Sequence, residues 1–324
     1  MRNKPDGEGL KVWQLSQLGY LLRWIYQEDG PLGIEYRHSK TPIKDPTDIC
    51  HLNKTQAVVA TLVDRLKAPG PVHVFVDNLF TGADLINVIR LMDHGLTGTV
   101  RPNAGIHEDI IKLKALDNKG QLDWEWGHHQ SWPTANCLVN FIAWKDHKLV
   151  LFGTSIYTGE ELETRRRRRP TSNSPWIKAV KRKFGDRHIM DLELLAVAAD
   201  YNDLMNAVDI SDQYRAQTVS DHRERRGAAK ALAWSFHLSV AVANSFLLQK
   251  LGHPQWPKVP TRYKWLDIII NEIFERYGKT GISRQRYRAG DQRTPFELHK
   301  MVYAKQAPCQ AGESIYIYLP RPQV

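Results

Sequence analysis

Cysteines and long apolar runs are scarce in this 324-residue sequence. The three cysteines, Cys50, Cys137 and Cys309, lie far apart and form no CxxC pair, so the sequence indicates neither a disulfide framework nor a zinc site. The longest apolar stretches are interrupted by polar residues or are too short to span a bilayer, and no charged-then-apolar leader opens the chain. We therefore expect an intracellular protein with no membrane segment.

Acidic residues are outnumbered by basic ones. The chain has 35 Asp and Glu against 45 Lys and Arg, a formal net charge of +10, which favours a polyanionic partner because each phosphate neutralised by a basic side chain releases counterions. Much of the excess lies in the runs 165–169, 178–187 and 221–230. For the first run, a solvated basic face or a nuclear-import signal is the alternative to nucleic-acid contact. The residues predicted to contact DNA are Arg165, Arg166, Arg167, Arg168, Arg169, Lys181, Arg182, Lys183, Arg223, Arg225, Arg226 and Lys230.

The first hundred residues alternate between strand-like and helix-like patterns. Two apolar runs on either side of Leu18 and Gly19 predict a β-hairpin. A helical pattern, a short apolar strand and a second helix with Gly95 as its C-terminal cap follow. The predicted elements are a hairpin over 10–26, helices over 52–66 and 82–95, and strands over 72–77 and 96–103. This order predicts an α/β domain with a mixed sheet.

The pattern changes between residues 104 and 199. A second hairpin is predicted around the "KDHK" turn, and the arginine run with the "PTSNSP" after it is typical of a flexible basic loop. Helical periodicity returns near Asp200 and continues through a long apolar helix that ends near Leu251. We therefore predict an α/β domain that is split by an insertion domain. The predicted boundaries are 1–103 and 200–252 for the two parts of the α/β domain, 104–199 for the insertion with its basic loop, and 253–324 for a C-terminal helix and tail.

Three aspartates are candidates for one metal site. Asp77 ends the apolar run "VHVFVD", at the strand end where ligands bind in open α/β sheets. Asp209 and Asp212 stand three residues apart in a helical segment, so both can point the same way. Carboxylate oxygens suit magnesium, and a pair of such ions activates an attacking water or hydroxyl and stabilises the leaving oxygen of a phosphodiester. Spacing alone leaves open the alternative that these aspartates are solvated or capping residues.

Several short motifs follow one another in a fixed order. "VFVDNLFTG" precedes "GTVRPN", "WKDHK", "YNDLMNAVDISDQ" and a basic segment that leads into "NSFLL". This series resembles the piggyBac family of DDE transposases, whose pattern is similar to DN-x-F-T-S, G-T-x-R-x-N, W-x-D-x-K, Y-N-x-x-M-G-G-V-D-x-x-D-Q and N-A/S-x-x-L. The resemblance runs from about residue 10 to residue 251, with the motifs in the right order.

The resemblance implies an RNase H-like fold, in which a mixed sheet flanked by helices is interrupted by an insertion domain. It also implies a nuclear, magnesium-dependent lineage that binds double-stranded DNA and cuts and rejoins it, favouring TTAA targets. In that lineage the second catalytic carboxylate falls on Asp77 and the third on Asp209, both as metal ligands, with Asp212 as an accessory acid. Self-association into a homodimer is left open.

The match fails at the first catalytic carboxylate. With Gly19 and Tyr20 as the anchor, the family's L-A-D-S-x-G-Y pattern places that carboxylate at Gln17. An amide offers a neutral oxygen where an anionic one is needed, so metal affinity and activation of the nucleophile should both fall. Glu28 and Asp29 lie one strand further on and are poor substitutes, because a displaced carboxylate does not rebuild a metal geometry.

Other departures agree with a loss of function. Asn206 and Ala207 replace the family's Gly-Gly, and Ala228 with Ala229 replaces aromatic residues that could stack on DNA bases. The favoured hypothesis is a transposase-derived DNA-binding protein with impaired catalysis. The alternatives are an active magnesium-dependent transposase and a decayed remnant or interaction scaffold with no role on DNA.

Overall fold

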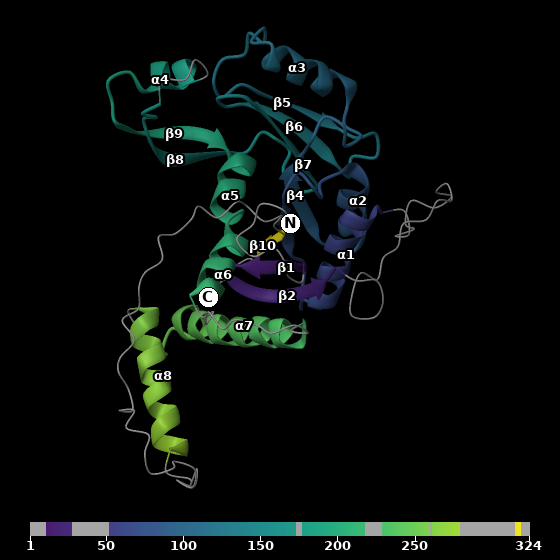
Figure 1. Cartoon of the computed structure of the whole chain (residues 1–324). Coiled ribbons are helices and arrows are strands. Elements are labelled where there is room, and N and C mark those ends of the chain that lie inside the picture. Colours follow the sequence, from purple (N-terminus) through teal and green to yellow (C-terminus); the bar gives the residue numbers. More distant parts are fainter. Residues whose placement is uncertain are drawn as a thin grey trace. The chain divides into compact units, whose positions relative to one another are not determined.

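The computed structural model describes residues 11–27, 52–172, 177–217, 229–259, 261–278 and 315–318 (Figure 1). The chain divides into two compact units, one formed by 1–243 with 312–324 and the other by 244–311. The first unit contains an eight-stranded sheet in the order β2-β1-β10-β3-β4-β7-β6-β5 and a separate two-stranded sheet of β8 and β9. The predicted α/β class with a mixed sheet and flanking helices is confirmed.

A tight hairpin begins the described chain. Strands β1 (Val12–Gln17) and β2 (Tyr20–Tyr26) pair antiparallel around Leu18 and Gly19. Both turn residues have positive φ, at 51° and 88°, which is the backbone that two-residue hairpin turns adopt because its twist matches that of the strands. Leu15 is fully buried in this hairpin. The hairpin predicted from the apolar runs is therefore confirmed.

A strand-helix-strand unit follows, after the helix α1 (Lys54–Leu66). Strands β3 (His73–Val76) and β4 (Gly95–Thr99) are parallel and are joined by α2 (Ala83–Leu91). The sequence predicted Gly95 as the cap of this helix, and that prediction was wrong: α2 ends four residues earlier, and Gly95 opens β4 and pairs with His73.

The next three strands extend the same sheet. After α3 (Glu108–Asn118), strands β5 (His129–Pro133), β6 (Asn140–Lys145) and β7 (Leu149–Thr154) form an antiparallel meander, and β7 pairs with β4. The range 104–199, which the sequence predicts to be a separate insertion domain, thus supplies three strands of the main sheet. The other strands of that range, β8 and β9, form a separate two-stranded sheet.

The arginine run is a strand and not a loop. Strand β8 (Leu162–Arg168) pairs antiparallel with β9 (Ile189–Leu195), and the short helix α4 (Lys178–Phe184) lies between them in sequence. Along β8 the side chains alternate between exposed and half-buried, as the two faces of a strand require. Pairing with β9 overrides the turn-like composition that suggested a loop.

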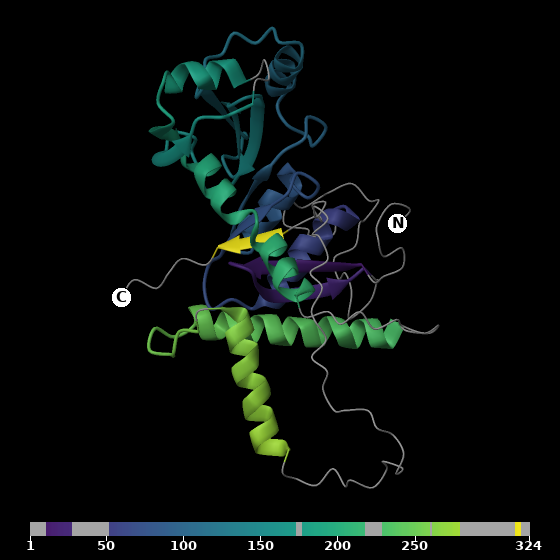
Figure 2. The same cartoon turned by 60° about the vertical axis from the view of Figure 1, so that its left-hand side comes forward.

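Strand β10 (Ile315–Tyr318) occupies the middle of the main sheet (yellow in Figure 2). It is parallel to β1 and antiparallel to β3, and the two strands have no direct pairing with each other. Consequently β1 and β3 run in opposite directions. This strand is not predicted from the sequence, where the tail shows no clear periodic pattern.

Apolar side chains cover both faces of the sheet. On β3, Val74 and Val76 join a core cluster with α1 and α2, whereas Phe75 joins a second cluster with α4, α5 and β9. All three side chains are fully buried, which explains why this strand is a continuous apolar run and does not alternate.

Four more helices complete the described chain. The segment that the sequence predicts as one helical stretch is divided into α5 (Ala196–Leu204) and α6 (Ala207–Ala216), and α7 (Ala229–Leu251) and α8 (Arg262–Tyr277) follow. Within the second unit, the rings of Phe246 and Trp265 pack edge to face with centroids 5.7 Å apart. Across the described residues, every helix is too short or too polar to cross a bilayer.

Candidate functional site

Asp77 is held in a tight turn at the carboxyl end of β3. Its backbone carbonyl accepts hydrogen bonds from the Phe80 amide at 3.0 Å, and from both the amide and the hydroxyl of Thr81. Its carboxylate Oδ1 accepts a hydrogen bond from the backbone N–H of Asn78 at 2.6 Å, and the side-chain Oδ1 of Asn78 accepts one from Arg101 Nε at 2.8 Å. The half-buried carboxylate is therefore fixed at a strand end, with a guanidinium anchored close by.

Gly98 on the neighbouring strand is required by the same turn. A Cβ at this position would lie 2.3 Å from Thr81 Oγ1 and 2.5 Å from the Val76 carbonyl oxygen, both far inside van der Waals contact. The glycine of the "GTVRPN" motif thus lets the "DNLFT" turn pack directly on β4. Two motifs that are separate in sequence form one structural unit.

Tyr201 connects this turn to α5. Its side chain is buried, and its hydroxyl lies 3.3 Å from Thr99 Oγ1 at the end of β4. Burial raises the pKa of Tyr201, and the negative charge of Asp77 raises it further, which places the tyrosine within electrostatic reach of that carboxylate. The "YN" motif therefore belongs to the same end of the sheet as Asp77.

Asp209 and Asp212 lie on α6, which packs against β1. Burial raises the pKa of Asp209, and the charge of Asp212 adds to the effect. Asp212 Oδ1 accepts hydrogen bonds from Arg215 at 2.6 Å and from Gln14 Nε2 at 3.3 Å. The Asp212 carboxylate thus forms an ion pair within its own helix and a hydrogen bond with Gln14 of β1.

Gln17 does not reach the end of the sheet where Asp77 lies. Leu15 and Val76 both pair with Ile315, but β1 and β3 run in opposite directions, so the chain beyond Leu15 leads away from Asp77. At about 3.3 Å of rise per residue, Gln17 is roughly 10 Å along the strand from the level of Asp77. The sequence predicts that residues 17, 77 and 209 converge, and the strand register separates Gln17 from Asp77.

The described residues do not present a ready magnesium site. In the ranges that the structure describes, no three His, Cys, Asp or Glu side chains gather closely enough to hold a metal ion. The Asp212 carboxylate accepts a hydrogen bond from Arg215. Glu28 and Asp29, the substitutes that we considered for Gln17, lie outside the described residues.

The arginines of β8 fall into two groups. Arg165 is neutralised by three carboxylates, with NH2 at 2.6 Å from Glu163, 3.1 Å from Asp203 and 3.8 Å from Asp200. Within the described part of the chain, the next three arginines have no ion-pair or hydrogen-bond partner; they are Arg166, Arg167 and Arg168. Arg166 and Arg168 are exposed, whereas Arg167 is half-buried on the other face of the hairpin.

The remaining predicted DNA contacts are spread over several segments. Arg169 and Lys181 are half-buried, and Arg182 and Lys183 are exposed on α4. Arg223, Arg225 and Arg226 lie outside the described residues, and of Lys230 only the backbone is described, as part of α7. The structure thus brings Arg166 and Arg168 onto one exposed face and leaves the third basic run untested.

The "WKDHK" motif holds two side chains in opposite environments. Lys145 forms an ion pair with Asp117 of α3, whose side chain is 1% exposed and also accepts from the Leu149 amide at 2.8 Å. The next residue, Asp146, accepts from the indole nitrogen of Trp126 at 2.9 Å. The hydrogen bond from Trp126 to this carboxylate could not be inferred from the sequence, because the 19 residues between Trp126 and Asp146 give no periodic signal that pairs the two.

Comparisons with known proteins agree with this architecture. A family model described as Transposase IS4 matches residues 1–246. Among solved structures, the chain is similar to a piggyBac transposase determined by cryo-EM as a synaptic complex with hairpin DNA, with a TM-score of 0.56 and 17% sequence identity. The match covers 89% of this chain and 51% of the piggyBac chain, so this chain spans about half the length of that protein. The chain therefore belongs to the IS4-type transposase family, and its RNase H-like fold is that of a piggyBac-type transposase.

Proposed function

We propose that this chain is a transposase-derived protein that binds double-stranded DNA through the exposed face of the β8–β9 hairpin. The observation that carries the proposal is the contrast within the arginine run: Arg165 is neutralised by carboxylates, whereas Arg166 and Arg168 are exposed and have no partner among the described residues. Unpaired guanidinium groups on a rigid strand supply phosphate contacts without first breaking internal ion pairs. The piggyBac structure that the fold resembles was solved with hairpin DNA, which supports the same partner.

The spacing of these two arginines suits a nucleic-acid backbone. Residues two apart on a strand are separated by about 6.7 Å, and the phosphates of one DNA strand rise by about 3.4 Å each along the helix axis, so the two guanidinium groups can contact different phosphates of one strand. Arg182 and Lys183 of α4 are exposed as well and extend the positive charge beyond β8. The contacts are expected to be to phosphates, so they position the protein on DNA without selecting a sequence.

Salt-dependent binding tests this proposal. Affinity for a duplex should fall steeply with salt, and Arg166→Gln or Arg168→Gln should each reduce the magnitude of the slope of log K against log salt by about 0.9. Arg165→Gln is the matched control, because it removes the same charge from the same strand but from a side chain already paired with carboxylates. Weak binding with little salt dependence would instead favour the decayed remnant or scaffold.

We further propose that strand cleavage by this chain is impaired, and that it acts mainly by binding. The family generally uses magnesium, and carboxylates such as Asp77 and Asp209 are the ligands that would hold it. Support for impairment comes from Asp212, whose carboxylate is engaged by Arg215 and Gln14 and so competes poorly for a cation. Gln17 adds no support for impaired cleavage, because it lies away from Asp77 in the sheet.

Cleavage assays separate this proposal from the active alternative. Magnesium-dependent nicking of a TTAA-flanked hairpin, abolished by Asp77→Asn, would establish an active transposase. The expected result is no nicking above the Asp77→Asn background under conditions in which the duplex is bound. Nuclear location and pairing with a second copy remain predictions from the family resemblance.

A further inference from the structure

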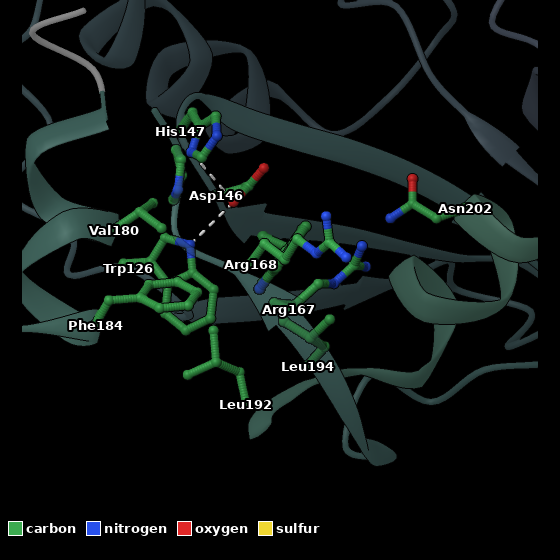
Figure 3. Close-up of a pocket in the computed structure, with 12 residues that line it drawn as sticks. Trp126, Asp146, His147, Arg167, Arg168, Val180, Phe184, Leu192, Leu194 and Asn202 are labelled. Carbon is green, nitrogen blue, oxygen red and sulfur yellow. Dashed lines mark hydrogen bonds and ion pairs between the residues drawn. The ribbon is translucent and has the colours of Figure 1, made fainter. Parts of the chain in front are cut away.

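A small cavity lies beside the β8–β9 hairpin, within the first unit (Figure 3). Its volume is about 180 Å³, which is smaller than the roughly 300–1,000 Å³ of sites for drug-sized ligands and so suits a single ring system. The rings of Trp126 and Phe184 gather on one side of it in Figure 3, and the side chains of Arg167 and Arg168 lie next to them. Trp144, at 5% exposed, contributes a second indole from β6.

The polar groups of the cavity are not fully used by the protein itself. Arg167 and Arg168 have no hydrogen-bond or ion-pair partner among the residues that the structure describes. Asp146 accepts a hydrogen bond from the Trp126 indole nitrogen through Oδ1, with His147 Nδ1 at 3.5 Å from the same oxygen, so Oδ2 has no partner among the described residues. The cavity therefore combines aromatic faces with the guanidinium of Arg167, which has no partner among the described residues, and one oriented acceptor.

This combination matches the parts of one unpaired nucleotide. A nucleobase offers a flat face for stacking on an indole and N–H groups for a carboxylate, and its phosphate is an anion for guanidinium groups. A fully paired duplex cannot offer the base face, because its bases are stacked inside the helix. An inorganic anion alone would satisfy the arginines but would leave the aromatic walls without a partner.

We propose that this cavity binds a single unpaired nucleotide of the DNA, with the base against Trp126 and the phosphate at Arg167. The inference rests on the proposed DNA-binding function and adds a second mode to it: the outer face of β8 holds the duplex backbone, and the cavity takes one base that is out of the stack. The protein then prefers DNA with an unpaired base over the same DNA fully paired.

Paired and bulged duplexes test the proposal directly. The intact chain is titrated with a duplex that carries one unpaired 2-aminopurine and with its fully paired counterpart, by anisotropy at one salt concentration. We expect affinity for the bulged duplex to be roughly tenfold higher, as one stacked base provides, with quenching of 2-aminopurine fluorescence. Equal affinity for the two duplexes would overturn the proposal and leave the duplex-binding function standing.

Variants locate the preference within the fold. Arg167→Gln and Trp126→Leu should each reduce the ratio of the two affinities to near one, whereas Arg166→Gln on the opposite face should lower both affinities and keep their ratio. If Trp126→Leu fails to fold, as judged by circular dichroism, Arg167→Gln alone decides. If Arg166→Gln also brought the ratio of the two affinities near one, the assignment of the preference to this cavity would be refuted. Competition by millimolar deoxyadenosine monophosphate, without any preference for the bulged duplex, would identify a site for free nucleotides and would also refute it.

Discussion

Removing the charge of Asp117 should destabilise the protein strongly, although this residue is far in sequence from every predicted catalytic position. The Asp117 side chain is 1% exposed and accepts hydrogen bonds from Lys145 and from the Leu149 amide, with Lys114 Nζ at 3.9 Å. Asp117→Asn keeps the shape but leaves Lys145, at 13% side-chain exposure, without its counter-charge. Removing one member of a buried pair costs about 3–5 kcal/mol, because the other charge remains desolvated.

The expected loss is large enough to measure by thermal unfolding. At about 2–4 °C per kcal/mol for a domain of this size, a loss of about 3 kcal/mol lowers the melting temperature by roughly 6 °C or more. Asp109→Asn on the same helix is the matched control, because Asp109 is 56% exposed and its ion pairs, with Lys112 and His107, are both on the surface. A surface pair contributes about 0–1 kcal/mol, so the control should change the melting temperature by a few degrees at most.

The effect of Asp117→Asn should also depend on pH. Burial acts to raise the pKa of Asp117, but hydrogen bonds from Lys145 and Leu149 and the nearby ammonium charges outweigh it and lower the pKa overall. A lowered folded-state pKa gives stability that is present above the unfolded value of about 3.9 and is lost as the pH falls through the folded value. The difference between parent and variant should therefore be full at pH 6 and shrink below about pH 4.

Two results would refute this reasoning. One is an Asp117→Asn melting temperature as close to the parent as that of Asp109→Asn. The other concerns the double variant Asp117→Leu with Lys145→Met, which removes both charges together. If it is no more stable than Asp117→Asn, an uncompensated lysine is not the cause of the loss, since replacing both partners of a buried pair by apolar residues is often close to neutral.

Three further predictions concern Gln17, Asp209 and Gly98. Gln17→Asp should not create tight binding of magnesium or manganese by calorimetry, because residue 17 lies away from Asp77; recovery of binding would restore the original alignment. Asp209→Asn should raise the melting temperature at pH 7 in metal-free buffer and have no effect near pH 3. Burial and the charge of Asp212 raise the pKa of Asp209, so its ionised form destabilises the folded state as the pH rises. An equal effect at both pH values would contradict this. Gly98→Ala should cost about 2 kcal/mol or more, since its Cβ would meet the Val76 carbonyl oxygen at 2.5 Å, whereas Gly70→Ala, with no atom within 4 Å of the added Cβ, should have a small effect in the same denaturant titration.

Much of the fold could be predicted because local signals and tertiary structure agree. The hairpin around Leu18 and Gly19, the helix α1 and the strand that ends at Asp77 follow from apolar periodicity and turn residues, and each is present in the structure. The arginine run could not be predicted as a strand, because its order depends on pairing with β9 and not on its own composition. The break at Asn206 between α5 and α6 is likewise a tertiary effect within one continuous helical pattern.

The candidate site was only partly accessible to sequence reasoning. The motifs placed Asp77 at a strand end and Asp209 on a helix, as the structure shows. The place of Gln17 relative to Asp77 could not be predicted, because strand direction within a sheet is set by long-range pairing, here through β10. The Trp126 and Asp146 contact joins residues from separate elements, which a single sequence without periodicity between them cannot reveal.

The place of β10 has a consequence for synthesis of the protein. Residues 315–318 supply the only hydrogen-bonded connection, among the described strands, between the β1–β2 hairpin and the remaining strands of the main sheet. Because β10 begins 239 residues after β3 ends (315 − 76), the two parts of the sheet stay separate, with unpaired inner edges, until this segment has been synthesised. Such long-range closure slows folding and exposes strand edges to other chains, so a nascent chain stalled before residue 315 should be the form most in need of a chaperone.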